Sequence, residues 1–226
     1  MDYVHRAERE AQLARAIAGL SSRQRISLLR IMGDPPKLEN VPPEYWNGQF
    51  TEWMGVMTPE LESIFVDSAE LMIADFPGLG VDWNMVNQSA ADWARRYGST
   101  LVRDIDARTL QGVRDAVGDF YEQGLTLGQL REKLGRWYGP NRASTLATTE
   151  TTRAAVEGER GITDDLARQG IVMVEVWQTN NDELVCPLCG PHHGKTEGDG
   201  WTRGDGPPAH PNCRCWTTHE LPVVAP

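Results

Sequence analysis

The side chains most able to do chemistry in this sequence are concentrated near its C-terminal end. The segment 182–216 contains all four cysteines of the chain and three of its five histidines. Cys186 and Cys189 form a C-x-x-C pair, and after a loop rich in glycine and proline the sequence brings His210, Cys213 and Cys215. Two short-spaced groups of thiolate and imidazole donors, separated by a loop, are typical of a structural zinc site.

Such a site needs four donors, and this segment offers five. Cys186 and Cys189 supply one pair, and the second pair must come from His210, Cys213 and Cys215. In an extended segment Cys213 and Cys215 point to the same side, because side chains alternate along a strand. We therefore predict that the metal ligands are Cys186, Cys189 and His210, together with one of Cys213 and Cys215.

The loop between the two donor groups is too polar to build a core of its own. It has glycines at 190, 194, 198, 200, 204 and 206. A metal ion or disulfides would close it, and a chain without a signal peptide favours metal because cytosolic thiols stay reduced. Two disulfides or free thiols are the alternative. His192 and His193 are either further ligands or solvated loop residues, and we favour the second interpretation.

This region resembles the C-terminal domain of the phage minor head proteins, also called the Mu F-like or head morphogenesis family. The resemblance covers about residues 105–220. That family carries an E-T-T-R-A helix, a strand ending in W-x-T, a D-x-x-x-C-x-x-C turn, a G-K pair and a closing P-P-x-H-P-x-C-R-C. Here these motifs stand at 150–154, 177–179, 182–189, 194–195 and 207–215.

The resemblance implies a structural protein and not an enzyme. Members of the family are few-copy proteins inside the capsid near the portal vertex, where they act in head assembly, DNA packaging or DNA delivery. It implies portal protein as the partner, with major capsid or scaffolding protein as further candidates. The expected location is the virion, and the host cytoplasm during assembly.

The alternative function is a metal-dependent nuclease or related effector centred on the Cys/His turn. His192 or His193 would act there with Asp182 or Glu183, in the manner of an HNH-like centre. The sequence contains no H-x-E deaminase motif, no H-E-x-x-H helix and no P-loop.

Composition indicates a folded protein that does not coat nucleic acid. Apolar residues make up 40% of the chain, charged residues 24%, and the net charge is −10. Neither residues 1–140 nor residues 141–226 are basic, and duplex binding depends on neutralising phosphates. We therefore expect no sequence-specific binding to nucleic acid. No run of apolar residues is long enough to span a membrane, so we expect a soluble protein without a membrane partner.

The elements that must position the cluster are mostly helical. Apolar spacing predicts helices over about 3–31, 58–75, 82–97, 106–123, 127–138 and 142–169. Paired prolines predict an extended linker from Gly33 to about residue 57. Its aromatic residues are either held against the body of the protein or reserved for a partner, and they are Tyr45, Trp46, Phe50 and Trp53.

A strand pattern follows the last helix, over residues 171–179 and bounded by Gly170 and Asn180-Asn181, and Trp216 begins a returning strand. We predict an α+β fold: a mainly helical N-terminal region, then a long helix packed on a small antiparallel sheet with a C-terminal turn closed by Cys and His. The predicted domains are 1–57, 58–140 and 141–226. On the long helix, Glu150 and Arg153 form either a surface pair or a buried one that holds the helix to the Cys/His turn.

Overall fold

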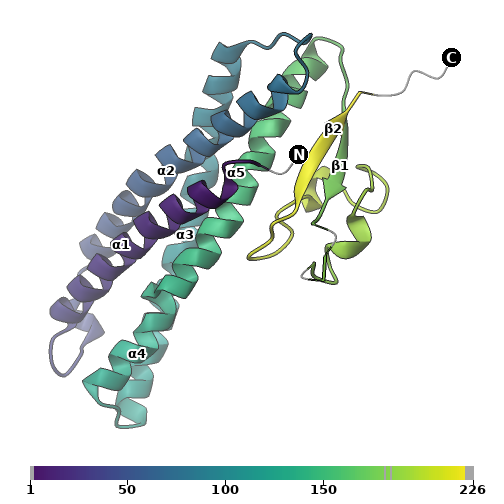
Figure 1. Ribbon diagram of the computed structural model, residues 1–226. Coiled ribbons are helices and arrows are strands. Elements are labelled where there is room, and N and C mark those ends of the chain that lie inside the picture. Colours follow the sequence, from purple (N-terminus) through teal and green to yellow (C-terminus); the bar gives the residue numbers. More distant parts are fainter. Residues whose placement is uncertain (1–2, 181, 184, 222–226) are drawn as a thin grey trace.

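The computed structural model describes residues 3–180, 182, 183 and 185–221. Among these residues, a group of α-helices precedes a two-stranded antiparallel sheet, which confirms the predicted α+β class (Figure 1). The helices are α1 (Arg6–Met32), α2 (Pro43–Ala74), α3 (Trp83–Glu122), α4 (Leu127–Tyr138) and α5 (Pro140–Arg168). The strands are β1 (Val174–Gln178) and β2 (Trp216–Glu220), and short 3-10 helices lie at Leu38–Asn40, Gly190–His192 and Arg203–Asp205.

Helices α1, α2, α3 and α5 share one apolar core. Leucine and isoleucine side chains from α1 and α2 meet alanines of α5 there, and all are buried. The small residues Ala143, Ala147 and Ala154 let the neighbouring helices approach α5 closely. Helix α5 therefore lies between the other long helices and the sheet, so it connects the bundle to the C-terminal part (Figure 1).

The sheet brings distant segments to one end of the molecule. Strand β1 pairs antiparallel with β2 in a register that sets Val174 opposite Glu220 and Gln178 opposite Trp216. Residues that follow β1 and residues that precede β2 must therefore lie at the same end of the sheet. Asn181, which we expected to help end the first strand, lies outside the described residues, as do residues 222–226 of the predicted C-terminal domain.

The extended linker predicted up to residue 57 is wrong, because α2 already begins at Pro43 and is helical throughout. Proline is well tolerated at the first position of a helix, where its missing N–H has no partner to lose. The aromatic residues are held against the body: Trp53 is buried and donates to Gln24 Oε1 (3.0 Å), and the Tyr45 hydroxyl donates to the Gln24 carbonyl (2.9 Å). This aromatic packing outweighs the local preference of the prolines.

The two helices predicted over 82–97 and 106–123 are one continuous helix, α3. Its start is as expected, since the Asp82 side chain accepts from the backbone N–H of Asn84 (3.0 Å). Gly98 does not end the helix but lies buried in it, beside Thr58 and Leu61 of α2. Among the described residues, no helix is both apolar and long enough to cross a bilayer.

Gly158→Ala is expected to destabilise the protein by about 1–3 kcal/mol, because a methyl group there has no room. A Cβ at Gly158 of α5 would overlap the backbone carbonyl of Phe65 in α2, and a backbone atom cannot rotate away. The matched control is Gly55→Ala in α2, where no atom lies within 4 Å of the added Cβ. The control should be neutral or stabilising, since alanine favours helix. Urea denaturation measures both, and equal midpoints would contradict the close α2–α5 contact.

Candidate metal centre

The sheet explains how the five predicted ligands come together. Cys186 and Cys189 lie in the turns that follow β1, whereas His210, Cys213 and Cys215 lie in the segment that leads into β2. Cys215 directly precedes Trp216, the first residue of β2. The antiparallel register thus places both donor groups at one end of the sheet, although more than twenty residues separate them in the chain.

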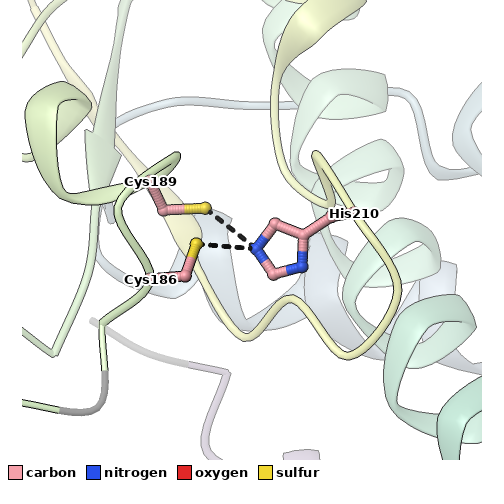
Figure 2. A group of neighbouring side chains, drawn as sticks. All are labelled: Cys186, Cys189 and His210. Atoms are coloured by element: carbon pink, nitrogen blue, oxygen red, sulfur yellow. Dashed lines mark hydrogen bonds between the residues drawn. The ribbon is translucent and has the colours of Figure 1, made fainter.

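The donor atoms converge without any other group between them. His210 Nε2 lies 3.1 Å from Cys186 Sγ and 3.2 Å from Cys189 Sγ, so both thiols point at the same ring nitrogen (Figure 2). Cys189 Sγ lies 3.9 Å from Cys213 Sγ. Two donors in a tetrahedral zinc site are about 3.3–3.8 Å apart, given metal–ligand distances of about 2.0–2.3 Å. The observed separations are close to these values.

Cys189 is the residue shared by two possible ligand groups. Cys186, Cys189 and His210 have donor atoms within 4.8 Å of one another, and so do Cys189, Cys213 and Cys215. All five predicted ligands are therefore gathered at one place, which could hold a metal ion. Cys213 and Cys215 both lie beside Cys189, so the structure leaves the choice between them open.

The thiols of the cluster are too crowded to ionise together without a compensating positive charge. His210 Nδ1 lies 2.8 Å from the Pro211 carbonyl, to which an N–H would donate, and this leaves the lone pair on Nε2 facing the two thiols. A hydrogen bond from Cys215 lowers the pKa of the Cys213 thiol to about 5. The same bond raises the pKa of Cys215, and burial raises the pKa of Cys189 to about 12. Crowded thiols cannot all ionise unless a positive charge compensates them.

The cysteines are not joined to one another in this structure. All four are free, and the Sγ atoms of Cys189 and Cys213 are 3.9 Å apart, well beyond the disulfide bond length of about 2.05 Å. Cys189, Cys213 and Cys215 are buried with Trp177 and Trp201 in a small apolar cluster. This apolar cluster is the local core of the C-terminal segment, because the two-stranded sheet alone would leave these side chains exposed to solvent.

Threonines of α5 hold the His210–Cys215 segment in place. Thr152 Oγ1 donates to the Cys213 carbonyl (2.8 Å), and the backbone N–H of Asn212 donates to Thr149 Oγ1 (3.0 Å). Asn212 has a positive φ of 62°, a conformation that asparagine tolerates better than most residues. The predicted helix over 142–169 contained both threonines, but the sequence did not reveal their partners. The bonds span about sixty residues of chain, beyond the reach of any local pattern.

Glu150 and Arg153 form neither a surface pair nor a buried pair that holds α5 to the Cys/His turn. Glu150 is buried, as in the second alternative, yet it accepts from the Tyr97 hydroxyl of α3 (2.6 Å) and holds α5 to that helix. Arg153 Nε lies 3.9 Å from Glu150 Oε2, and its guanidinium lies over the Tyr97 ring. The Cys/His turn is held by the neighbouring threonines instead.

His192 and His193 lie outside both ligand groups that the described residues form. The His192 ring packs against Trp177 with 4.9 Å between ring centroids and is half-buried. His193 is exposed, and its Nδ1 accepts from the backbone N–H of Thr179 (3.1 Å). These contacts give both histidines a role in shaping the loop.

A second group of titratable side chains is buried where α5 meets the sheet. Glu159 accepts from Thr217 Oγ1 (2.9 Å), and His219 Nδ1 lies 3.8 Å from Glu159 Oε2. Burial raises the pKa of Glu159 to about 8, and burial lowers the pKa of His219 to about 4. Both groups are therefore mainly uncharged at neutral pH in the folded protein.

We expect the parent protein to become less stable as the pH rises from about 6.5 to about 8, and we expect Glu159→Gln to lack this decrease. A carboxyl whose pKa is raised by folding contributes stability below its ordinary value of 4.5 and loses it as the pH rises through about 8. His219, whose pKa is lowered by folding, stabilises the protein as the pH rises, but this effect is complete above its ordinary pKa of 6.5 and so does not change within the range.

The measurement is the difference in free energy of unfolding between parent and Glu159→Gln across this range. Titration of the thiols affects both proteins equally and cancels in the difference. A difference that stays constant with pH would contradict the raised pKa of Glu159.

The described residues thus give a Cys/His cluster at one end of the sheet, fixed to α5 and able to hold a metal ion. Comparisons with protein-family models, with curated proteins and with solved structures found no match for this chain. The residue pattern and the geometry of the cluster are therefore the observations that bear on function.

Proposed function

We propose that the protein is a non-enzymatic phage minor head protein that binds near the portal inside the capsid. It acts in head assembly, DNA packaging or DNA delivery, in the virion and, during assembly, in the host cytoplasm. Its C-terminal part is held by a structural zinc ion on Cys186, Cys189, His210 and one of Cys213 and Cys215. Portal protein is the partner, with major capsid or scaffolding protein as further candidates.

The observation that carries this proposal is that all the segments of the resemblance pack into one unit. The Lys195 carbonyl of the G-K pair accepts from the backbone N–H of Trp177 (2.9 Å) and from Trp201 Nε1 (3.0 Å). Thr152 of the helix motif bonds to the Cys213 carbonyl (2.8 Å). Motifs that were matched only by order and spacing thus have a physical reason to occur together.

Zinc is the metal that fits this donor set best. Thiolate and imidazole donors select zinc over magnesium, calcium and manganese, which take oxygen ligands. A structural zinc site is closed by four protein donors, whereas a catalytic site keeps one position open. The five donors gathered here are enough to close the site, which supports a structural role.

Co-expression with the portal protein encoded in the same genome tests the proposal. We expect the chain to co-purify with portal protein and to be found in assembled heads in few copies. Separate co-expression of the chain with portal protein and with major capsid protein shows which of the two is the partner. The proposal would be overturned if the protein did not co-purify with portal protein and were missing from purified heads.

A metal-dependent nuclease is the second candidate, and one observation favours it. A hollow of about 180 Å³ adjoins the cluster and is lined by Asp182 and Arg214 as well as by Cys186 and His210. A carboxylate beside a metal is a common base in hydrolysis. Cleavage of DNA that requires a divalent metal, and that is lost in Asp182→Asn, would establish this function in place of the structural one.

A further inference from the structure

A groove of about 800 Å³ runs between the helices and the Cys/His turn. Its walls come from α3, from the end of α4, from the first half of α5 and from the segment 208–211. His210 therefore belongs both to the Cys/His cluster and to the groove, since its ring lies against Cys186 and Cys189 and the residue also lines the groove. The position of this wall depends on the Cys/His cluster.

The groove is positively charged in a protein whose net charge is −10. Four arginines line it, against two carboxylates. Arg142 donates to the Trp137 carbonyl (2.6 Å) and to Thr109 Oγ1 (2.8 Å), both of which are neutral oxygens. Arg108 and Arg136 are exposed, and within the described part of the chain neither forms an ion pair. Arg108 and Arg136 thus line the groove without a carboxylate partner among the described residues, whereas Arg142 interacts electrostatically with Asp106.

Apolar side chains lie among these charges. The lining includes Leu101, Ile105, Trp137 and Leu146, and the guanidinium of Arg142 lies over the Trp137 ring, 5.4 Å from its centroid. A surface that mixes arginine with apolar and aromatic side chains is typical of the core of a protein interface. A nucleic acid could use the arginines but would leave the apolar side chains of Leu101, Ile105 and Leu146 without a partner, whereas an amphipathic acidic segment uses both kinds of lining residue.

We infer that this groove binds an acidic, amphipathic peptide segment of a partner protein, and that metal binding at the Cys/His cluster shapes the groove for it. Carboxylates of the segment pair with Arg108 and Arg136, and its apolar side chains pack against Trp137 and Leu146. Guanidinium groups favour carboxylates because they present several donors in one plane. The coupling to metal rests on the proposed structural ion, but binding itself does not require that the partner be portal protein.

Fluorescence anisotropy with labelled peptides tests the groove in the full-length, zinc-loaded protein. The probe is a short peptide that alternates Glu and Leu, and its control has Gln in place of Glu. We expect saturable binding of the acidic peptide and about tenfold weaker binding of the neutral one. The double variant Arg108→Glu/Arg136→Glu should lose about tenfold or more. The matched control Arg103→Glu/Arg131→Glu changes exposed arginines of the same two helices outside the groove and should bind as the parent does.

Two further arms separate the outcomes. A single-stranded oligonucleotide of equal charge should bind more weakly than the peptide, and tighter binding that is lost in Arg108→Glu/Arg136→Glu would overturn the peptide as occupant. Chelation of zinc should weaken peptide binding, and an unchanged affinity would overturn the coupling to the Cys/His cluster. Equal affinities of the parent and of both double variants would overturn the groove itself, whatever the co-expression with portal protein shows.

Discussion

Cys189→Ser is expected to abolish metal binding and to unfold the region from β1 to β2, while α1 to α5 stay helical. Cys189 is the donor shared by both ligand groups, and it is buried. Structural zinc contributes about 10–16 kcal/mol in small zinc domains, and the two short strands have little other core. The helices keep their own apolar core, because none of the residues in that core comes from the C-terminal segment.

The metal content and two spectroscopic melts check this expectation. Elemental analysis should find about one zinc per parent chain and none in Cys189→Ser. The part of the near-ultraviolet circular dichroism that comes from the buried Trp177 and Trp201 should be lost in Cys189→Ser, while the part from Trp53 of α2 and the far-ultraviolet signal of the helices should remain. The matched control is Leu188→Ser, the neighbouring residue, whose side chain is 68% exposed. If Cys189→Ser keeps its zinc and melts like Leu188→Ser, the cluster is not what holds this region.

Arg160→Met is expected to destabilise the folded protein by about 3–5 kcal/mol, because it leaves a buried carboxylate without its partner. Arg160 of α5 donates to Glu175 of β1 through Nε (3.1 Å) and through its terminal nitrogen (2.9 Å). Both side chains are about 7% exposed, so water cannot replace the lost bonds. Since the pair joins the bundle to the sheet, its loss should loosen the attachment of the C-terminal part.

A double-mutant cycle separates the destabilisation caused by an unpaired buried charge from the stabilisation that the ion pair itself contributes. Arg160→Met/Glu175→Met removes the buried pair and should recover most of the lost stability, because a well-packed apolar pair often replaces a buried ion pair without loss. The bond from Arg160 to the half-buried Glu157 (3.1 Å) is lost in the single and in the double variant alike, so it does not enter the comparison between them. Arg95→Met is the control, since its pair with Asp92 is exposed on α3 and should contribute less than about 1 kcal/mol. Urea denaturation gives the free energies of unfolding, and a change below about 1 kcal/mol in Arg160→Met would contradict a buried, paired Glu175.

Local patterns in the sequence predicted most of the elements, and the errors have a common cause. The periodic apolar residues of α5 and the β-branched run of β1 predicted both elements correctly. Pro42 and Pro43 wrongly predicted an extended linker, because the buried Trp53 makes the helical form of α2 more favourable. The predicted helix end at residue 97, just before Gly98, is wrong, because a glycine inside a helix also permits close packing against another helix.

The sequence by itself determined which donors make up the candidate metal centre. The types and spacing of the five donors, from Cys186 to Cys215, were enough to predict which side chains meet, because a polar loop without a core of its own is closed by the donor groups at its two ends. Only the tertiary structure decided what surrounds them: the bonds from Thr149 and Thr152, the burial of Glu150 against Tyr97, and the arginine-lined groove. These contacts join residues that lie tens of positions apart, so they depend on how α5 packs against its neighbours and leave no periodic signal in the chain.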